Sequence, residues 1–150
     1  MKSLNKFFVG AAALVLLTAC GPAKVSYDKF HEKAVAALKD AKEKKFDVTL
    51  KGTYKDDDGE HKMDNVVLKW NEGAFVPTDI LHLDEVAAAT LMNGLTADVA
   101  SEDENTTYYA GNGFKATKET DDGKYEMVWN KYGLPTSWKN GGTNVTASYK

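Results

Sequence analysis

Few side chains in this sequence have the types and spacing that catalysis requires. The three histidines, His31, His61 and His82, are tens of residues apart and form no His-x-His or His-x-x-x-His pair. No Gly-x-Ser-x-Gly elbow and no Walker glycine motif occurs, and Cys20 is the only cysteine. The sequence therefore predicts a protein that is not an enzyme, and no cofactor or catalytic residue is expected.

The chemistry that the sequence does indicate is at Cys20. Lysines 2 and 6 precede an apolar run over residues 7–17, and small residues lead into the cysteine. This order is typical of a secretory signal, and the run is shorter than the roughly 20 apolar residues that cross a bilayer. An unmodified thiol behind an ordinary signal is the alternative to a modified cysteine, but ordinary cleavage sites usually read Ala-x-Ala.

The segment Leu17-Thr18-Ala19-Cys20 resembles the lipobox of bacterial lipoproteins. In that family the signal is removed and the cysteine carries palmitate-like acyl chains. The resemblance implies a signal peptide over 1–19, a lipidated Cys20 with a tether over 20–25, and one domain over 26–150. It also implies a cell-envelope location: the outer membrane if the host has two membranes, otherwise the outer face of the cell membrane.

The charge balance limits the partners. All 19 basic residues are lysines, and 22 acidic residues outnumber them. Such a chain lacks both the basic surplus of nucleic-acid-binding proteins and the bidentate fork of arginine. Nucleic acid is therefore not an expected partner, whereas the membrane is expected through the lipid anchor.

Two acidic clusters deserve comparison with metal sites. Residues 56–60 read Asp-Asp-Asp-Gly-Glu, but the glycine arrives too early for an EF-hand calcium loop, so a hairpin turn is favoured. His82 has Asp79, Asp84 and Glu85 nearby, which suggests a surface divalent site or the paired acids of a hydrolase. The alternative is an ordinary first helical turn whose acids favour the helix dipole. We expect no metal.

The periodicity predicts an α+β fold. Ser26 is a candidate N-cap for an amphipathic helix that runs to about Lys44, and residues 80–95 form a second helix. Apolar and polar residues alternate in the remaining segments, which glycine-containing turns separate. Residues 73–79 are expected to be a loop. The predicted strands cover residues 46–54, 62–71, 106–110, 113–120, 124–130, 134–140 and 143–149. We therefore expect a curved antiparallel meander, like half a barrel, packed against the two helices.

Aromatic side chains recur on nearly every predicted strand. Alternation places six of them on one side of the sheet: Phe46, Tyr54, Trp70, Tyr125, Trp129 and Trp138. One interpretation is that they form the core beneath the helices. The other is that two short helices leave part of the face uncovered, as an apolar groove for a lipid or another hydrophobic ligand.

The outline of the chain also resembles the half-barrel lipoproteins of the LolA/LppX type. A lipidated start and a helix precede a long meander containing Tyr-Tyr-Ala-Gly-Asn-Gly-Phe (108–114) and Trp-Asn-Lys-Tyr-Gly-Leu-Pro-Thr-Ser (129–137). Those proteins carry acyl chains, and no binding residue transfers from them. The resemblance implies a membrane-anchored, non-enzymatic lipoprotein that binds a hydrophobic ligand or lipid at its aromatic face. The alternatives are an adaptor or structural protein of the envelope and an envelope hydrolase that uses carboxylates.

Overall fold

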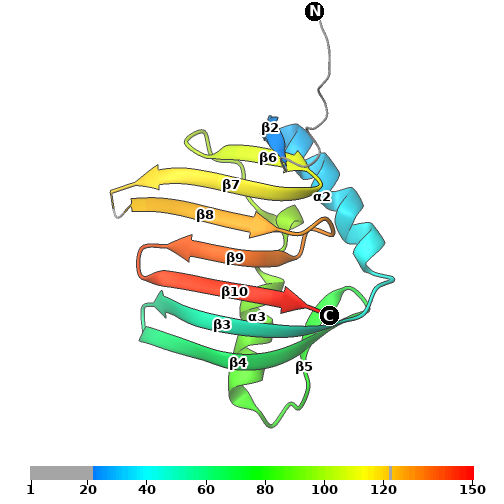
Figure 1. Ribbon diagram of the computed structural model, residues 1–150, viewed down its shortest axis with the longest axis vertical. Coiled ribbons are helices and arrows are strands. Elements are labelled where there is room, and N and C mark those ends of the chain that lie inside the picture. Colours follow the sequence, from blue (N-terminus) through cyan, green and yellow to red (C-terminus); the bar gives the residue numbers. More distant parts are fainter. Residues whose placement is uncertain (1–21, 122) are drawn as a thin grey trace, which may run out of the picture.

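A computed structural model describes residues 22–121 and 123–150 (Figure 1). The predicted signal peptide, Cys20 and its lipidation lie outside the described residues. The described chain forms nine strands, two α-helices and one short 3-10 helix. The predicted α+β class is confirmed, and no described helix is long and apolar enough to cross a membrane.

The first described helix, α2 (Tyr27–Ala41), begins where the sequence predicts. The Ser26 side chain accepts a hydrogen bond from the Lys29 amide, and Asp28 lies in the first turn. The helix ends three residues before the expected Lys44. Its last residue, Ala41, accepts a 2.8 Å hydrogen bond from the Trp70 indole, which fixes the point where the chain leaves the helix for the sheet.

The second helix, α3 (Leu83–Asn93), is shorter than the predicted 80–95. His82 occupies its N-cap and Gly94 its C-cap. Ile80 and Leu81 have helical spacing in the sequence, but they lie in the loop before the helix and are 77% and 80% exposed. A helix predicted from periodicity alone can extend into such a loop, because the spacing of apolar residues does not show where the backbone turns.

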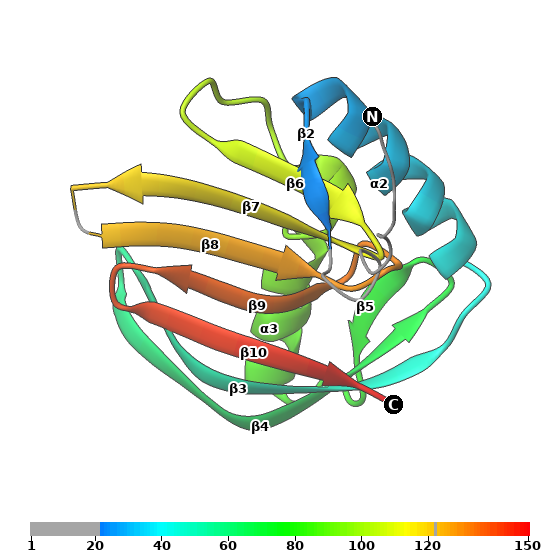
Figure 2. The same cartoon turned by 45° about the horizontal axis from the view of Figure 1, so that its top comes forward.

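All nine strands pair antiparallel in one open sheet, in the order β2-β6-β7-β8-β9-β10-β3-β4-β5. The sheet curves around the helices (Figure 2). The strands are β2 (Ala23–Val25), β3 (Phe46–Asp56), β4 (Gly59–Asn71), β5 (Ala74–Pro77), β6 (Thr107–Gly111), β7 (Gly113–Thr120), β8 (Gly123–Trp129), β9 (Pro135–Asn140) and β10 (Thr143–Tyr149).

Two predicted irregular segments are strands, and these expectations were wrong. Ala23–Val25, expected in the tether, pairs with β6 as one edge of the sheet, and Ala74–Pro77, expected in a loop, pairs with β4 as the other edge. Both are too short to show a period. Pro77 favoured a loop, yet proline is tolerated at the end of an edge strand because no further strand needs its amide.

The concave face of the sheet carries the core. A register row across six strands runs through Ala116, Met127, Trp138, Val145, Gly52 and Met63. Asn65, with φ +56°, is the extra residue of a β-bulge that keeps Met63 and Val66 on this same face. Helix α2 covers the β6–β8 half of the face and α3 covers the β3–β5 half, each over its own apolar cluster.

Candidate functional site

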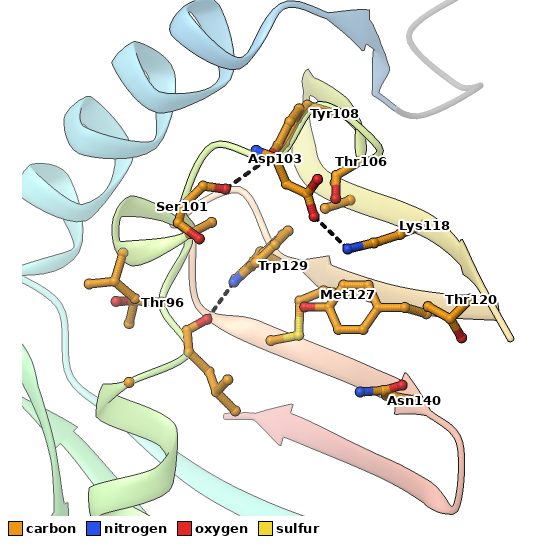
Figure 3. Close-up of a pocket in the computed structure, with 16 residues that line it drawn as sticks. Thr96, Ser101, Asp103, Thr106, Tyr108, Lys118, Thr120, Met127, Trp129 and Asn140 are labelled. Carbon is orange, nitrogen blue, oxygen red and sulfur yellow. Dashed lines mark hydrogen bonds and ion pairs between the residues drawn. The ribbon is translucent and has the colours of Figure 1, made fainter. Parts of the chain in front are cut away.

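The best-formed hollow in the described structure is a pocket of about 370 Å³ on the concave face. It lies between strands β6–β9 and the segment that links α3 to β6, which contains the short helix η2 (Ala97–Val99). Figure 3 shows its lining residues. We call this hollow the sheet pocket. Neither α2 nor α3 extends over it, because the link between α3 and β6 forms its outer wall.

The floor of the sheet pocket is apolar. Ala116 and Met127 come from neighbouring strands in one register row, and Trp129 lies two residues further along β8. All three are buried. The Trp129 indole donates a 2.6 Å hydrogen bond to the Leu95 carbonyl, which ties the outer wall to the floor. Val99 lines the same pocket and is 53% exposed, so it offers a further apolar surface near the opening.

The opening of the sheet pocket is polar. Lys118 donates a 2.6 Å hydrogen bond to Asp103, and each of these side chains is about one-third exposed. This contact, together with the Asn105 amide, holds the pKa of Asp103 below its usual range, and it raises the pKa of Lys118. Tyr125 is opposite Lys118 in the β7–β8 register, and burial raises the pKa of its phenol.

Tyr108 positions the wall segment that carries Asp103. Its ring is 5% exposed, its hydroxyl donates to the Ser101 carbonyl at 2.8 Å, and the same hydroxyl accepts from the Asp103 amide at 3.0 Å (Figure 3). Two bonds from one buried side chain therefore fix the backbone on either side of Glu102. The backbone that carries Asp103, the partner of Lys118, is held in place as a result.

Two of the six aromatic residues predicted to bind a ligand line the sheet pocket: Tyr125, which is half-buried, and Trp129. The other four do not. Trp70 is 2% exposed in the core beneath α3, where Phe75 packs edge-on against it. Phe46 packs between Tyr132 and Tyr149 at the edge of the same core.

Tyr54 and Trp138, the remaining two predicted residues, lie on the same concave face in different surroundings. Tyr54 stacks on His61 near the β3–β4 turn, with ring centroids 4.7 Å apart. Trp138 is half-buried and contacts both apolar clusters, beside a hollow of only about 10 Å³. That volume is at the lower limit for a single water molecule. The six aromatics therefore divide between core and pocket.

Glu85, the acid that contacts His82, serves the fold around α3. Glu85 is 9% exposed and accepts hydrogen bonds from the Thr78 amide at 2.7 Å, the Thr78 hydroxyl at 2.5 Å and the His82 ring. The Thr78 contacts lower the pKa of Glu85 to about 2, and Glu85 in turn raises the pKa of His82. Among the described residues, no group of three or more His, Cys, Asp or Glu side chains converges as a metal site requires.

Residues 56–60 form the predicted hairpin turn between β3 and β4. The Asp56 carboxylate accepts from the Asp58 amide and pairs with His61, each at 2.9 Å, and these contacts lower its pKa. The Asp56 Oδ1 atom therefore serves the turn itself.

Sequence reasoning missed the polar half of the sheet pocket. Lys118 follows Ala116 by two residues, so strand alternation places it on the apolar face. A lysine on an otherwise apolar face was the signal available. Asp103 and Val99 come from a segment without periodicity, which offered no comparable signal. No family model matches the sequence, and comparisons with curated proteins and with solved structures find no match either.

Proposed function

We propose that this protein is a lipid-anchored, non-enzymatic lipoprotein of the bacterial cell envelope that binds a small amphipathic molecule in the sheet pocket. One observation carries the ligand-binding part: an apolar floor of Ala116, Met127 and Trp129 meets a fixed polar pair, Asp103 and Lys118, in one open pocket. Small-molecule sites typically combine a predominantly apolar lining with a few positioned polar groups.

The size and charge of the sheet pocket define the ligand class. Its volume of about 370 Å³ is near the lower end of the usual range for ligand sites, about 300–1,000 Å³. It therefore suits a compact molecule or the end of one acyl chain rather than a whole phospholipid. Asp103 and Lys118 already neutralise each other, so a head group without a large net charge fits best.

The lipoprotein part of the proposal depends on the lipobox and on the half-barrel resemblance. The open curved sheet with helices on its concave face agrees with that outline. In the proposed protein, acyl chains on Cys20 hold the domain at the membrane. Each buried methylene contributes about 0.8 kcal/mol, and one chain alone gives only reversible binding, so two or more chains are expected.

The ligand proposal is tested by placing a charge in the sheet pocket. Val99→Asp puts a carboxylate against the apolar lining, and Val35→Asp is the matched control because Val35 is 48% exposed on α2, away from the pocket. We expect V99D to weaken binding of the neutral dye N-phenyl-1-naphthylamine by about tenfold or more. Bound dye would remove the carboxylate from water, and a desolvated charge is costly. V35D should bind as the parent does. Equal affinities in the two variants, or no dye uptake by the parent, would refute the proposal.

The anchor is tested separately. Cells grown with a clickable palmitate analogue should label the protein, and Cys20→Ser should abolish the label. A parent without label, or equal labelling of both proteins, would contradict lipidation at Cys20.

An envelope adaptor is the second candidate function, because the loop before α3 and the first residue of that helix expose three large aliphatic side chains. Ile80, Leu81 and Leu83 are 77–80% exposed where β5 leads into α3. Exposed apolar patches of this kind mark interaction sites. A photo-crosslinking residue at Leu81 should yield one reproducible envelope-protein adduct in intact cells, and the same residue at Val35 should not. Absence of a specific adduct at Leu81 would count against this function.

A further inference from the structure

The antiparallel order of the sheet brings particular loops together at each end of the strands. At one end lie the α2–β3 loop, the β4–β5, β6–β7 and β8–β9 turns, and the residue that follows β10. At the other end lie the β3–β4, β7–β8 and β9–β10 turns. We call the first group the basal face and the second the tip end. Figure 1 shows the two ends on opposite sides of the sheet.

The two ends carry opposite charge. The basal face presents five exposed lysines, Lys42, Lys44, Lys45, Lys131 and Lys150, against three exposed acids, Glu43, Asp47 and Glu72. None of these lysines forms an ion pair with another described residue. The tip end presents six exposed acids, Asp56, Asp57, Asp58, Glu60, Glu119 and Asp121, against three exposed lysines, Lys55, Lys124 and Lys139. The domain therefore has a charge polarity along its strands.

The chain joins the domain at the basic end. Strand β2 begins at Ala23, which pairs with Ala110 beside the β6–β7 turn, and it runs from there toward the tip end. Pro22 therefore enters at the end where β10 finishes and β3 starts. Only one further residue separates Pro22 from Cys20. A lipid anchor at Cys20 would hold the basal face closest to the bilayer.

The basal face also contains a hollow that suits a lipid head group. A depression of about 370 Å³ lies between the start of β3 and the end of β4, and its lining consists of Lys45, Phe46, Asp47, Lys69, Trp70, Asn71 and Lys150. Lys69 pairs with Asp47 at 2.9 Å. The Asn71 Oδ1 atom is buried without a hydrogen-bond partner among the described residues. The Asn71 Oδ1 atom is closed off from solvent, so the match depends on the lysines, which a head-group phosphate would contact.

We propose that the basal face lies against an anionic lipid surface, so that electrostatics orient the anchored domain with its tip end away from the membrane. This inference rests on the proposed anchoring at Cys20. A lysine near an anionic bilayer favours membrane association by about fivefold, and the effect falls off within a Debye length of about 10 Å at 0.1 M salt. In the reverse orientation the same surface would repel the acids of the tip end, which further favours the proposed orientation.

The test uses the purified lipidated protein in vesicles of pure phosphatidylcholine or with added phosphatidylglycerol, each containing a lipid-borne quencher. A fluorophore is attached either at Asn112→Cys, in the exposed β6–β7 turn of the basal face, or at Asp57→Cys, at the tip end. We expect phosphatidylglycerol to quench the Asn112 label at least twofold more than phosphatidylcholine does, and to leave the Asp57 label unquenched. Raising the salt to 0.5 M should remove the difference.

A pair of charge-matched variants separates this face from net charge. Lys44→Glu with Lys45→Glu reverses two basal lysines, and Lys55→Glu with Lys124→Glu makes the same change at the tip end. Only the basal pair should abolish the added quenching. Equal quenching of both labels, no response to phosphatidylglycerol, or equal effects of the two pairs would overturn the proposal. Flotation with phosphatidylcholine vesicles reports the anchor alone, so a failed anchor is distinguished from a failed basal face.

Discussion

Replacement of two glycines that have similar φ angles but different surroundings tests how closely the central strands pack. Gly52 lies in β3 between Val145 of β10 and Met63 of β4, with φ +127°. Gly59 begins β4 at the β3–β4 turn, with φ +122°. A Cβ atom at Gly52 would overlap the Asn144 carbonyl oxygen and lie 2.8 Å from the Val145 Cα, whereas one at Gly59 would have no atom within 4 Å.

The expected magnitudes follow from this contrast. Alanine at either position adopts a backbone conformation that costs about 1–3 kcal/mol. At Gly52 the added methyl also meets backbone atoms of β10, which cannot rotate away as a side chain does, and overpacking of this kind costs a further 1–3 kcal/mol or so. We therefore expect Gly59→Ala to lower the free energy of unfolding by about 1–3 kcal/mol and Gly52→Ala by about 2–6 kcal/mol.

Urea denaturation followed by tryptophan fluorescence measures both values in one buffer. The quantity that decides the issue is the difference between the variants, because the backbone cost is common to both and cancels. A difference below about 0.5 kcal/mol, or a greater loss of unfolding free energy for Gly59→Ala, would refute the reasoning. It would show that β10 and β3 can move apart to admit the methyl group without a loss of stability.

Two further predictions concern single hydrogen-bonding side chains. Glu85→Gln should destabilise the fold at pH 7, and the loss should fade as the pH falls from about 4.5 toward 2, because the hydrogen bonds that lower the pKa of Glu85 stabilise the fold only while its carboxylate is ionised. Asp84→Asn serves as the control in the same denaturation series. Trp129→Phe and Trp70→Phe each leave a backbone carbonyl without its indole donor. Each should lower the free energy of unfolding, measured by urea denaturation, by about 1–3 kcal/mol. Only Trp129→Phe should alter dye binding, because Trp129 lines the sheet pocket.

Most of the fold was predictable because its elements have a clear period. Strands β7 and β10 match the predicted 113–120 and 143–149 residue for residue, since glycine-containing turns lie at both ends of β7 and directly before β10. The two edge strands were missed for a physical reason. Ala23–Val25 and Ala74–Pro77 are extended only because each pairs with a longer neighbour, and such tertiary pairing leaves no local pattern in three or four residues.

The site was predictable only in part, because alternation identifies a face but does not show what covers it. Tyr125, Trp129 and Trp70 were all expected on one side of the sheet. Whether each of these side chains is buried depends on the positions of α2, α3 and the link to β6. Contacts between residues far apart in the sequence determine those positions. Trp70 is sealed by the end of α2, whereas Trp129 is bounded by a wall whose position depends on the hydroxyl of Tyr108.

The positions of the sheet pocket and the basal face together constrain the route of the ligand. Thr120 and Asn140, the last residues of β7 and β9, line the pocket at the tip end. If the basal face rests on the anchoring membrane, this polar opening faces away from that bilayer, so the ligand reaches the pocket from the aqueous side. A dye bound in the sheet pocket should then escape a quencher carried by the anchoring lipids even while a label at Asn112 is quenched. Quenching of both would mean that the domain lies on its side, with the pocket open to the lipid.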